Sequence, residues 1–282
     1  MKFLNYNGKF FEEGTPIITA DSRGLRYGDG LFETIKYKNK ECILLQEHLS
    51  RLWSGLSKLQ FDRPKLFTPE FLEDEIEKLV HKNKETAARI RLNIFKGKGG
   101  LYDAENHHPN FVIQTMPLKT DGQVLNSNGL QLCIYRDALK IVDSFSNLKH
   151  NNFLPYTMGA QFAKQQKCND AIILNQHHRV SDSSIANIFL VKDGVLYTPA
   201  LSEGCVAGIM RKFVLESLPE LEVKVVECSI TEDTLMDADE VFLSNSIYNI
   251  RWVAGINEKQ YSNEVTKDIF GKLATTNPGI IC

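Results

Sequence analysis

The chain has 282 residues, of which 43% are apolar and 24% are charged, with a formal net charge of −2 at pH 7. A chain of this length predicts about two domains of ordinary size, because a single hydrophobic core rarely grows further. The weak negative charge argues against nucleic-acid binding, and no apolar run approaches the roughly 20 residues that span a bilayer, so the composition favours a cytoplasmic protein with no membrane segment.

Patterns of apolar side chains predict two helices and several strands in the first part of the chain. Alternating apolar and polar side chains predict strands at residues 3–11 (a hairpin turned at Asn7-Gly8), 31–37, 88–95 and 111–115. Apolar residues at helical spacing predict a helix over residues 46–60. Thr68 before Pro69 is typical of a helix start and predicts a second helix to about residue 82. We expect an N-terminal α/β domain over residues 1–115.

A cluster of polar and turn-forming residues predicts an interdomain linker at residues 116–128, followed by a C-terminal domain over residues 129–282. Strand patterns in that domain cover residues 130–135, 171–174, 188–192, 223–226 and 240–243. Helix patterns cover residues 152–166, 211–218, 231–236 and 263–274. Because helices and strands do not alternate strictly, the order favours an α+β (mixed α/β) fold over a doubly wound sheet.

Several common functional signatures are missing from the sequence. The glycines at residues 28–30 and 97–100 lack the spacing of dinucleotide- and phosphate-binding loops. The six cysteines are widely spaced, which favours reduced thiols, and adjacent histidines on a strand face opposite ways. We therefore expect no metal site and no disulfide framework. The early polar residues also argue against a signal peptide.

Three separated segments carry chemistry that makes sense together. Lys149 lies between a predicted strand and a predicted helix, and Asp182 and Asn187 lie just before another strand. Residues 204–211 read as a turn that opens a helix, whose backbone N–H groups can bind an anion. Taken alone, Lys149 is more simply a solvated surface lysine, but its neighbours favour a functional role.

The chain resembles the class IV (fold type IV) pyridoxal-phosphate enzymes, which include branched-chain and D-amino-acid aminotransferases and aminodeoxychorismate lyase. The resemblance spans nearly the whole sequence. It is carried by five segments in the family's order, at residues 21–34, 46–52, 89–91, 187–211 and 238–246. It implies two α/β domains with pyridoxal 5′-phosphate at their junction, and a homodimer.

The resemblance also implies roles for individual residues. Lys149 matches the lysine that forms a Schiff base with the cofactor and then moves the substrate's Cα proton. Arg51 matches the arginine that binds the cofactor's phosphate, a use that suits a planar fork of donors. The expected cofactor-binding residues are Arg51, Asp182, Asn187, Gly208, Ile209, Met210 and Ser246.

Two positions depart from the family's pattern. Asp182 stands where the family normally has glutamate, the acid that keeps the pyridine nitrogen protonated. The shorter side chain either reaches that nitrogen through a shift or a bridging water, or leaves a weaker electron sink. Leu154 stands where branched-chain enzymes carry a tyrosine that contacts the phenolic oxygen, and Asn151 and Asn152 are alternative partners for that oxygen.

A group of cations and aromatic residues is the expected substrate site. Tyr27 and Phe32 match residues that line the substrate pocket in the family. Arg89 and Arg91 point the same way from one predicted strand, and Lys96 follows them. These cations form either a solvated basic face or a wall that binds substrate carboxylates, as the resemblance implies for Arg91.

Three functions stay open on the sequence. The main prediction is an aminotransferase that moves an amino group between an amino acid, of branched-chain or D type, and a 2-oxo acid. The alternative is aminodeoxychorismate lyase, which eliminates pyruvate to give 4-aminobenzoate. Residues 186–211 look more like the lyase, and residues 89–91 look more like the branched-chain enzymes. A weakly catalytic pyridoxal-phosphate-binding protein is suggested only by Asp182.

Overall fold

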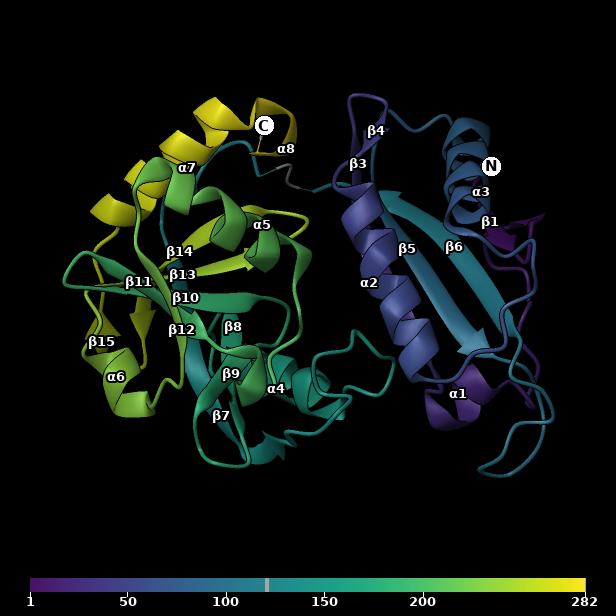
Figure 1. Cartoon of the computed structure of the whole chain (residues 1–282), viewed down its shortest axis with the longest axis horizontal. Helices are drawn as coiled ribbons and strands as arrows, with labels where there is room; N and C mark the ends of the chain where they lie inside the picture. The colour runs from purple at the N-terminus through teal and green to yellow at the C-terminus, as the bar shows by residue number, and fades with distance from the viewer. Residues whose placement is uncertain (120–121, 282) are drawn as a thin grey trace. The chain divides into compact units, whose positions relative to one another are not determined.

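The computed structural model describes residues 1–119 and 122–281, which form two compact units (Figure 1). Unit 1 consists of Met1–Lys119 together with Leu148–Asn152, and unit 2 contains the remaining described residues. Residues 148–152, expected in the C-terminal domain, group instead with unit 1, because their backbone pairs with a strand of that unit. Residues 120 and 121 of the predicted linker, and residue 282, lie outside the described residues.

Unit 1 is built on a six-stranded antiparallel sheet in the order β2-β1-β6-β5-β3-β4. Its strands are β1 (Phe3–Tyr6), β2 (Lys9–Glu12), β3 (Gly30–Lys38), β4 (Glu41–Cys42), β5 (Ala87–Lys96) and β6 (Pro109–Pro117). Its helices are α1 (Arg23–Tyr27), α2 (Leu45–Lys58) and α3 (Pro69–Asn83). The strands and helices predicted for this part of the chain are all present, and the short elements α1 and β4 are additional.

Helices α2 and α3 cover one face of this sheet (Figure 1). Ile90, Leu92 and Ile94 alternate along β5 and are fully buried in a core that includes leucines of both helices. Because side chains alternate along a strand, residues 89, 91 and 93 project from the opposite face, where they are half-buried. The sheet therefore has one apolar face and one polar face.

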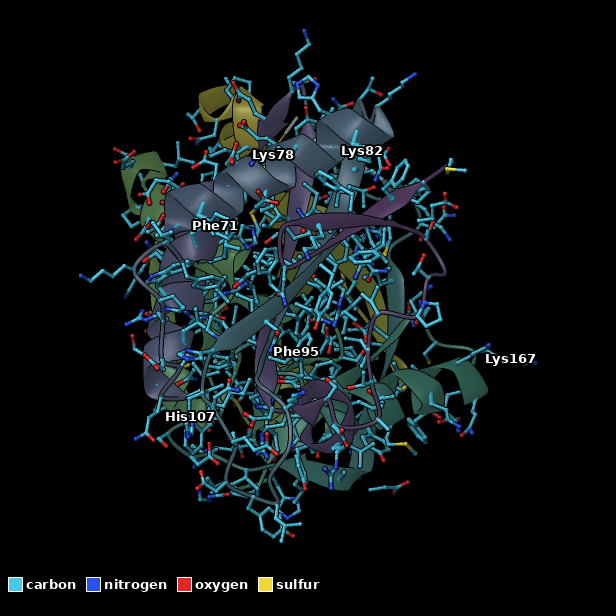
Figure 2. The ribbon with its side chains drawn as sticks, turned by 90° about the vertical axis from the view of Figure 1, so that its right-hand side faces the viewer. Phe71, Lys78, Lys82, Phe95, His107 and Lys167 are labelled. Carbon is cyan, nitrogen blue, oxygen red and sulfur yellow. The ribbon has the colours of Figure 1, made fainter. Side chains whose placement is uncertain are left out.

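The start of α3 follows the capping rule that predicted it. Thr68 Oγ1 accepts a hydrogen bond from Phe71 N–H at 3.2 Å, and Pro69 is the first helical residue. Figure 2 shows Phe71, Lys78 and Lys82 along this helix. The Lys82 ammonium lies 4.2 Å from the centroid of the Phe3 ring and covers that aromatic side chain.

Unit 2 is built on a mixed nine-stranded sheet in the order β12-β11-β10-β13-β14-β7-β8-β9, with β15 paired to β14. Its strands are β7 (Leu130–Lys140), β8 (Asp170–Asn175), β9 (Val180–Ser183), β10 (Asn187–Lys192), β11 (Val195–Pro199), β12 (Val225–Cys228), β13 (Glu240–Asn245), β14 (Asn249–Ile256) and β15 (Lys259–Gln260). The α-helices are α4 (Leu154–Gln165), α5 (Ile209–Ser217), α6 (Glu232–Met236), α7 (Glu264–Thr276) and α8 (Pro278–Ile281), and short 3₁₀ turns cover Leu201–Glu203 and Pro219–Leu221. Parallel pairs (β11 with β12, and β7 with β14 and β8) occur beside antiparallel ones, which confirms the predicted mixed α/β class. None of the helices in the described part of the chain is long and apolar enough to cross a membrane.

The sequence patterns do not predict β9, β11 and β14. β9 contains two serines and Asp182, which are weak strand formers, and it forms because it pairs with β8. The Asp193-Gly194 pair is a sequence signal for a hairpin that leads into β11. In the structure both residues have positive φ and close a two-residue hairpin between β10 and β11. β14 follows β13 through a three-residue turn and pairs with it in register.

The first residue of β3 cannot carry a side chain. A Cβ on Gly30 would lie 2.0 Å from the Ile94 carbonyl oxygen and 2.8 Å from Phe95 Cα. We expect Gly30→Ala to lower the free energy of unfolding by about 2 kcal/mol or more, because the backbone of two paired strands must move. Urea denaturation measures the change.

The matched control is Gly271→Ala, on the exposed side of α7, where a Cβ meets nothing within 4 Å. This variant is expected to raise the free energy of unfolding by about 0.5–1 kcal/mol, because alanine is the better helix former. Equal effects of the two substitutions would contradict the close approach at Gly30.

Candidate functional site

The backbone of Lys149 is fixed against the first residues of β3. Phe32 N–H donates a hydrogen bond to Lys149 O at 2.9 Å, and Asn151 N–H donates to Gly30 O at 2.9 Å. Gly28 has a φ of +62°, and a Cβ on Gly30 would lie 2.9 Å from Asn151 Nδ2, so glycine is needed for this approach. Lys149 therefore has a defined position in unit 1 although it lies outside any helix or long strand.

The side chains of Lys149 and Arg91 both contact the ring of Phe32. Its ammonium lies 4.5 Å from the centroid of the Phe32 ring, and the guanidinium carbon of Arg91 lies 4.1 Å from the same centroid. Both contacts are within cation–π distance. Two cations so close to one ring produce a positive potential that attracts an anion such as a carboxylate.

A buried acid fixes the orientation of Arg51. Arg51 Nε and Nη2 donate to the two carboxylate oxygens of Glu33 at 2.9 and 2.5 Å. His48 Nδ1 lies 2.6 Å from Glu33 Oε2, and both His48 and Glu33 are 1% exposed or less. His48 and Arg51 are three residues apart on α2 and therefore share a face of that helix. A two-point pair of this kind holds the guanidinium plane in one orientation.

The charges of this network follow from opposing effects. Burial raises the pKa of the Glu33 carboxyl, but Arg51 and His48 outweigh burial and lower the pKa from 4.5 to about 2. The pKa of His48 is lowered from its usual 6.5, because the effect of burial outweighs the opposing effect of the Glu33 carboxylate. Neutral His48 therefore donates its Nδ1 proton to Glu33. Its Nε2 atom is buried with no hydrogen-bond partner among the described residues.

The predicted basic wall contains Arg89 and Arg91 but not Lys96. Arg89 and Arg91 lie on the polar face of β5, opposite Lys36 and Thr34 of β3. Lys96 projects from the opposite face of β5. Its ammonium lies 5.5 Å from the centroid of the ring of Phe61, which belongs to the core that covers that face. Side-chain alternation thus separates Lys96 from the two arginines, and its role in substrate binding stays a prediction.

Tyr27 lies at the end of α1 beside a loop that Arg23 holds in place. The buried Arg23 guanidinium donates to Gly99 O, Leu101 O and Tyr102 O at 3.2, 2.8 and 3.1 Å. The Tyr27 and Tyr102 ring centroids are 6.1 Å apart. The loop that follows β5 therefore brings a second tyrosine beside Tyr27, for which the local sequence carries no signal.

In unit 2, Asp182 lies on β9 with its two carboxylate oxygens in different surroundings. Asp182 is 2% exposed, and its Oδ2 atom accepts hydrogen bonds from Val206 N–H and from the Tyr156 hydroxyl, both at 2.9 Å. The Lys140 ammonium lies 3.6 Å from the same oxygen. Oδ1 is buried and has no hydrogen-bond partner among the described residues. A buried oxygen of this kind is available to an N–H donor.

Lys140 and Tyr156 were not candidates on the sequence. Lys140 is the last residue of β7, and its ammonium donates to the hydroxyl of Tyr156 on α4. Burial, followed by the nearby Asp182 carboxylate, raises the pKa of Tyr156, so the phenol keeps its proton. Neither residue has a local signal, because β7, α4 and β9 are brought together only by the tertiary fold.

The start of α5 forms a cradle that accepts no side chain. Gly208 is the N-cap of α5, and a Cβ there would lie 1.9 Å from Asn187 Oδ1. Asn187 Nδ2 donates to Val206 O at 2.8 Å, which fixes the turn that leads into the helix. The N–H groups of Ile209 and Met210 belong to the first helical turn and have no acceptor within the helix, so they suit an anion.

Ser246 lies at the turn between β13 and β14, two residues beyond Ser244. Ser244 pairs with Asn187 in the sheet, and Asn245 Nδ2 donates to Ile185 O at 3.2 Å. The turns before β10 and after β13 are therefore neighbours, and α5 packs against β13. The predicted cofactor-binding residues of unit 2 thus lie on connected strand ends and turns.

Unit 2 offers a ligand both hydrogen-bond donors and a buried acceptor. The cradle at residues 208–210 offers backbone N–H groups to an anion, and Asp182 Oδ1 offers a buried acceptor to a cationic N–H group. Val206 links the two, because its N–H binds Asp182 and its carbonyl accepts from Asn187. A ligand that carries both a phosphate and a protonated ring nitrogen matches this pair of features.

Because the pKa of Glu33 is about 2 in the folded chain, against 4.5 ordinarily, its ionisation stabilises the fold above pH 4.5. That contribution, about 3 kcal/mol, is lost as the pH falls from 4.5 toward 2, since the unfolded chain takes up the proton first. We expect Glu33→Gln to be less stable than the wild type at pH 7 and to show a shallower loss of stability over that interval. Urea denaturation at a series of pH values measures both effects.

Glu12→Gln, which changes an exposed glutamate at the end of β2, is the control and should follow the wild-type curve. A Glu33→Gln curve that runs parallel to the wild type between pH 4.5 and 2 would show that another group is responsible.

Comparison with known proteins bears on the fold and the family. The model of the family described as "Amino-transferase class IV" matches residues 30–256. An aminodeoxychorismate lyase of Vibrio harveyi is 30% identical over 94% of this chain and 100% of its own length. A branched-chain aminotransferase of Thermoproteus uzoniensis, solved with norvaline, has a TM-score of 0.86 and 26% identity over 95% of this chain and 92% of its own.

A third relative, the branched-chain amino acid aminotransferase of Escherichia coli, has a solved structure with a TM-score of 0.85 at 24% identity, covering 98% of this chain and 93% of its own. This likeness supports the fold. The family model and the 30% identical relative both extend over most of the described residues. The chain therefore belongs to the class IV aminotransferase family of enzymes.

Proposed function

We propose that the chain is a pyridoxal-phosphate-dependent aminotransferase that moves an amino group between an amino acid, of branched-chain or D type, and a 2-oxo acid. The observation that carries this proposal is the buried Asp182 carboxylate, which has one oxygen held by Val206 and Tyr156 and the other without a partner among the described residues. This is the arrangement that a protonated pyridine nitrogen requires of its acid.

The remaining residues of unit 2 also fit the cofactor. The turn at Gly208, Ile209 and Met210 has the polarity for a phosphate, because the first N–H groups of α5 have no acceptor within the helix. Ser246 adds a hydroxyl from the turn after β13, and Asn187 holds the turn that forms the cradle. In unit 1, the guanidinium of Arg51, oriented by Glu33, is by itself suited to a phosphate.

Lys149 is the proposed catalytic residue. When bound, the cofactor supplies an aldehyde that receives the amino group and a cationic ring that draws negative charge away from the substrate's Cα. Lys149 Nζ would hold the cofactor in the resting enzyme and, once released, would carry the proton between the substrate's Cα and C4′ of the cofactor. Its backbone hydrogen bond with Phe32 fixes the main-chain position from which the amine acts.

The polar face of β5 is the proposed substrate-binding surface. Arg91 and Arg89 attract a substrate carboxylate, and Phe32 presents an aromatic ring beside them. Tyr27, held next to Tyr102, contributes a second aromatic surface. All candidate substrates carry at least one carboxylate, so this surface does not by itself distinguish between them.

The second candidate is 4-amino-4-deoxychorismate lyase, which uses the same cofactor to eliminate pyruvate and leave 4-aminobenzoate. It is favoured by the 30% identical relative of that name, which this chain covers in full. A weakly catalytic pyridoxal-phosphate-binding protein is the third candidate, and its one argument is the aspartate at position 182. We further propose, on the resemblance, a cytoplasmic homodimer. The linker predicted over residues 116–128 begins later than expected, because Met116 and Pro117 pair with β5 as the end of β6.

A substrate panel separates the three candidates. The reconstituted protein is mixed with L- and D-amino acids, and conversion to the pyridoxamine form is followed by absorbance. Conversion with an amino acid, reversed by a 2-oxo acid, supports the aminotransferase. Release of pyruvate from aminodeoxychorismate without such conversion supports the lyase. A protein that binds the cofactor and reacts with none of these compounds would support the third candidate.

We expect Lys149→Ala to abolish covalent attachment of the cofactor and to reduce turnover by several orders of magnitude, because the amine that bonds the cofactor and moves the proton is lost. Borohydride reduction followed by peptide mass spectrometry measures the attachment. Lys164→Ala, which removes an exposed lysine from α4, is the control and should be labelled at Lys149 as the wild type is. Borohydride labelling that persists in Lys149→Ala would place the bond on another lysine.

A further inference from the structure

A buried lysine stands behind Asp182 in unit 2. The side chains of Lys140 and Asp182 are 8% and 3% exposed, and the Lys140 ammonium lies 3.6 Å from Asp182 Oδ2. The Tyr156 hydroxyl lies between them and contacts both groups. The three residues come from β7, α4 and β9, so the fold assembles this arrangement from separate parts of the chain.

The hydrogen bonds of the three residues run in one direction. An ammonium can only donate, so Lys140 donates to the Tyr156 oxygen, and the one phenolic proton of Tyr156 is then donated to Asp182 Oδ2. The raised pKa of Tyr156 agrees with this direction, because the phenol stays protonated. The positive charge of Lys140 thus reaches Asp182 both directly and through a polarised hydroxyl.

Two further groups beside Asp182 carry no positive charge. Val206 contributes a backbone N–H, and Cys205 contributes a buried thiol. Burial, followed by the Asp182 carboxylate, raises the pKa of Cys205 to about 12, so this thiol is neutral at pH 7. Lys140 is the cation in direct contact with the carboxylate, and the buried Arg211 guanidinium, which also acts on Cys205, is paired with Glu227.

Burial disfavours an ionised carboxylate unless a cation or strong donors accompany it. Asp182 must be ionised to pair with a protonated ring nitrogen, and its Oδ1 atom must keep a fixed position to do so. Because Lys140, Tyr156 and Val206 all act on Oδ2, they leave Oδ1 for the ligand and limit rotation of the short side chain.

We propose that Lys140 is a positioning residue that acts on Asp182 directly and through Tyr156, holding Oδ2 in place so that Oδ1 is left for the ring nitrogen of the cofactor. This inference depends on the proposed function, since it concerns the same cofactor. It assigns a role to a buried lysine that does not touch the cofactor itself.

The test compares two ligands that differ at one atom. Cofactor-free, full-length protein is titrated with pyridoxal 5′-phosphate and with its 1-deaza analogue, which has carbon in place of the ring nitrogen. Tryptophan fluorescence reports both dissociation constants. The preference for the natural cofactor, taken as the ratio of the two constants, isolates the contact with Asp182 from contacts with the phosphate. A loss of structure alone weakens both ligands and leaves the ratio unchanged.

We expect Lys140→Met to lower this preference on the order of tenfold or more, because the buried carboxylate loses the cation beside Oδ2 and Tyr156 loses the donor that fixes the direction of its hydroxyl. Tyr156→Phe should lower the preference by a smaller factor, and Lys140→Arg, which keeps the charge, should retain it. Lys164→Met, an exposed lysine on α4, is the matched control and should behave as the wild type does.

An unchanged preference in Lys140→Met overturns the inference and leaves the proposed function intact. If Lys140→Met does not fold, as judged by circular dichroism, an unchanged preference in Tyr156→Phe overturns it instead. Wild-type protein that binds neither ligand overturns the proposed function and the inference together.

Discussion

A buried carboxylate can hold a cationic ligand only if it remains ionised, and this constraint organises the polar interior of unit 2. Asp182 has lost almost all contact with water, and Lys140, Tyr156 and the Val206 N–H take the place of that water. All three act on one oxygen. The other oxygen is left as an acceptor, and the asymmetry of the carboxylate is therefore produced by its surroundings.

Unit 1 uses a buried acid in a different way. Both oxygens of Glu33 are occupied, by the fork of Arg51 and by His48, and the carboxyl has a pKa of about 2 as a result. Such an acid has no capacity left for a ligand, and it orients the groups around it. Asp182 and Glu33 are both buried and paired with cations, but only Asp182 keeps an oxygen without a partner among the described residues. That difference separates an acid that binds a ligand from one that positions a side chain.

Local sequence accounts for most elements and for the residue types of the site. Thr68-Pro69 marked the start of α3, and side-chain alternation correctly put Arg89 and Arg91 on one face of β5. The same alternation, carried to the end of the strand, separates Lys96 from them. By contrast, β9 is composed of weak strand formers, and Lys140 and Tyr156 lie 42 and 26 residues before Asp182. Contacts at such separations leave no periodic pattern in the sequence.

The sequence by itself determined the mixed α/β class, the family, and the identity of a lysine, an arginine, an acid and a helix start as candidates for a cofactor site. These features depend on local propensity, on turn chemistry and on short motifs, which neighbouring residues specify. Tertiary structure alone decided which oxygen of Asp182 is held, which cation lies beside it, and that residues 148–152 pair with β3. Those outcomes depend on the distances between atoms that only the packing of remote segments sets, because charge and hydrogen bonding act through space.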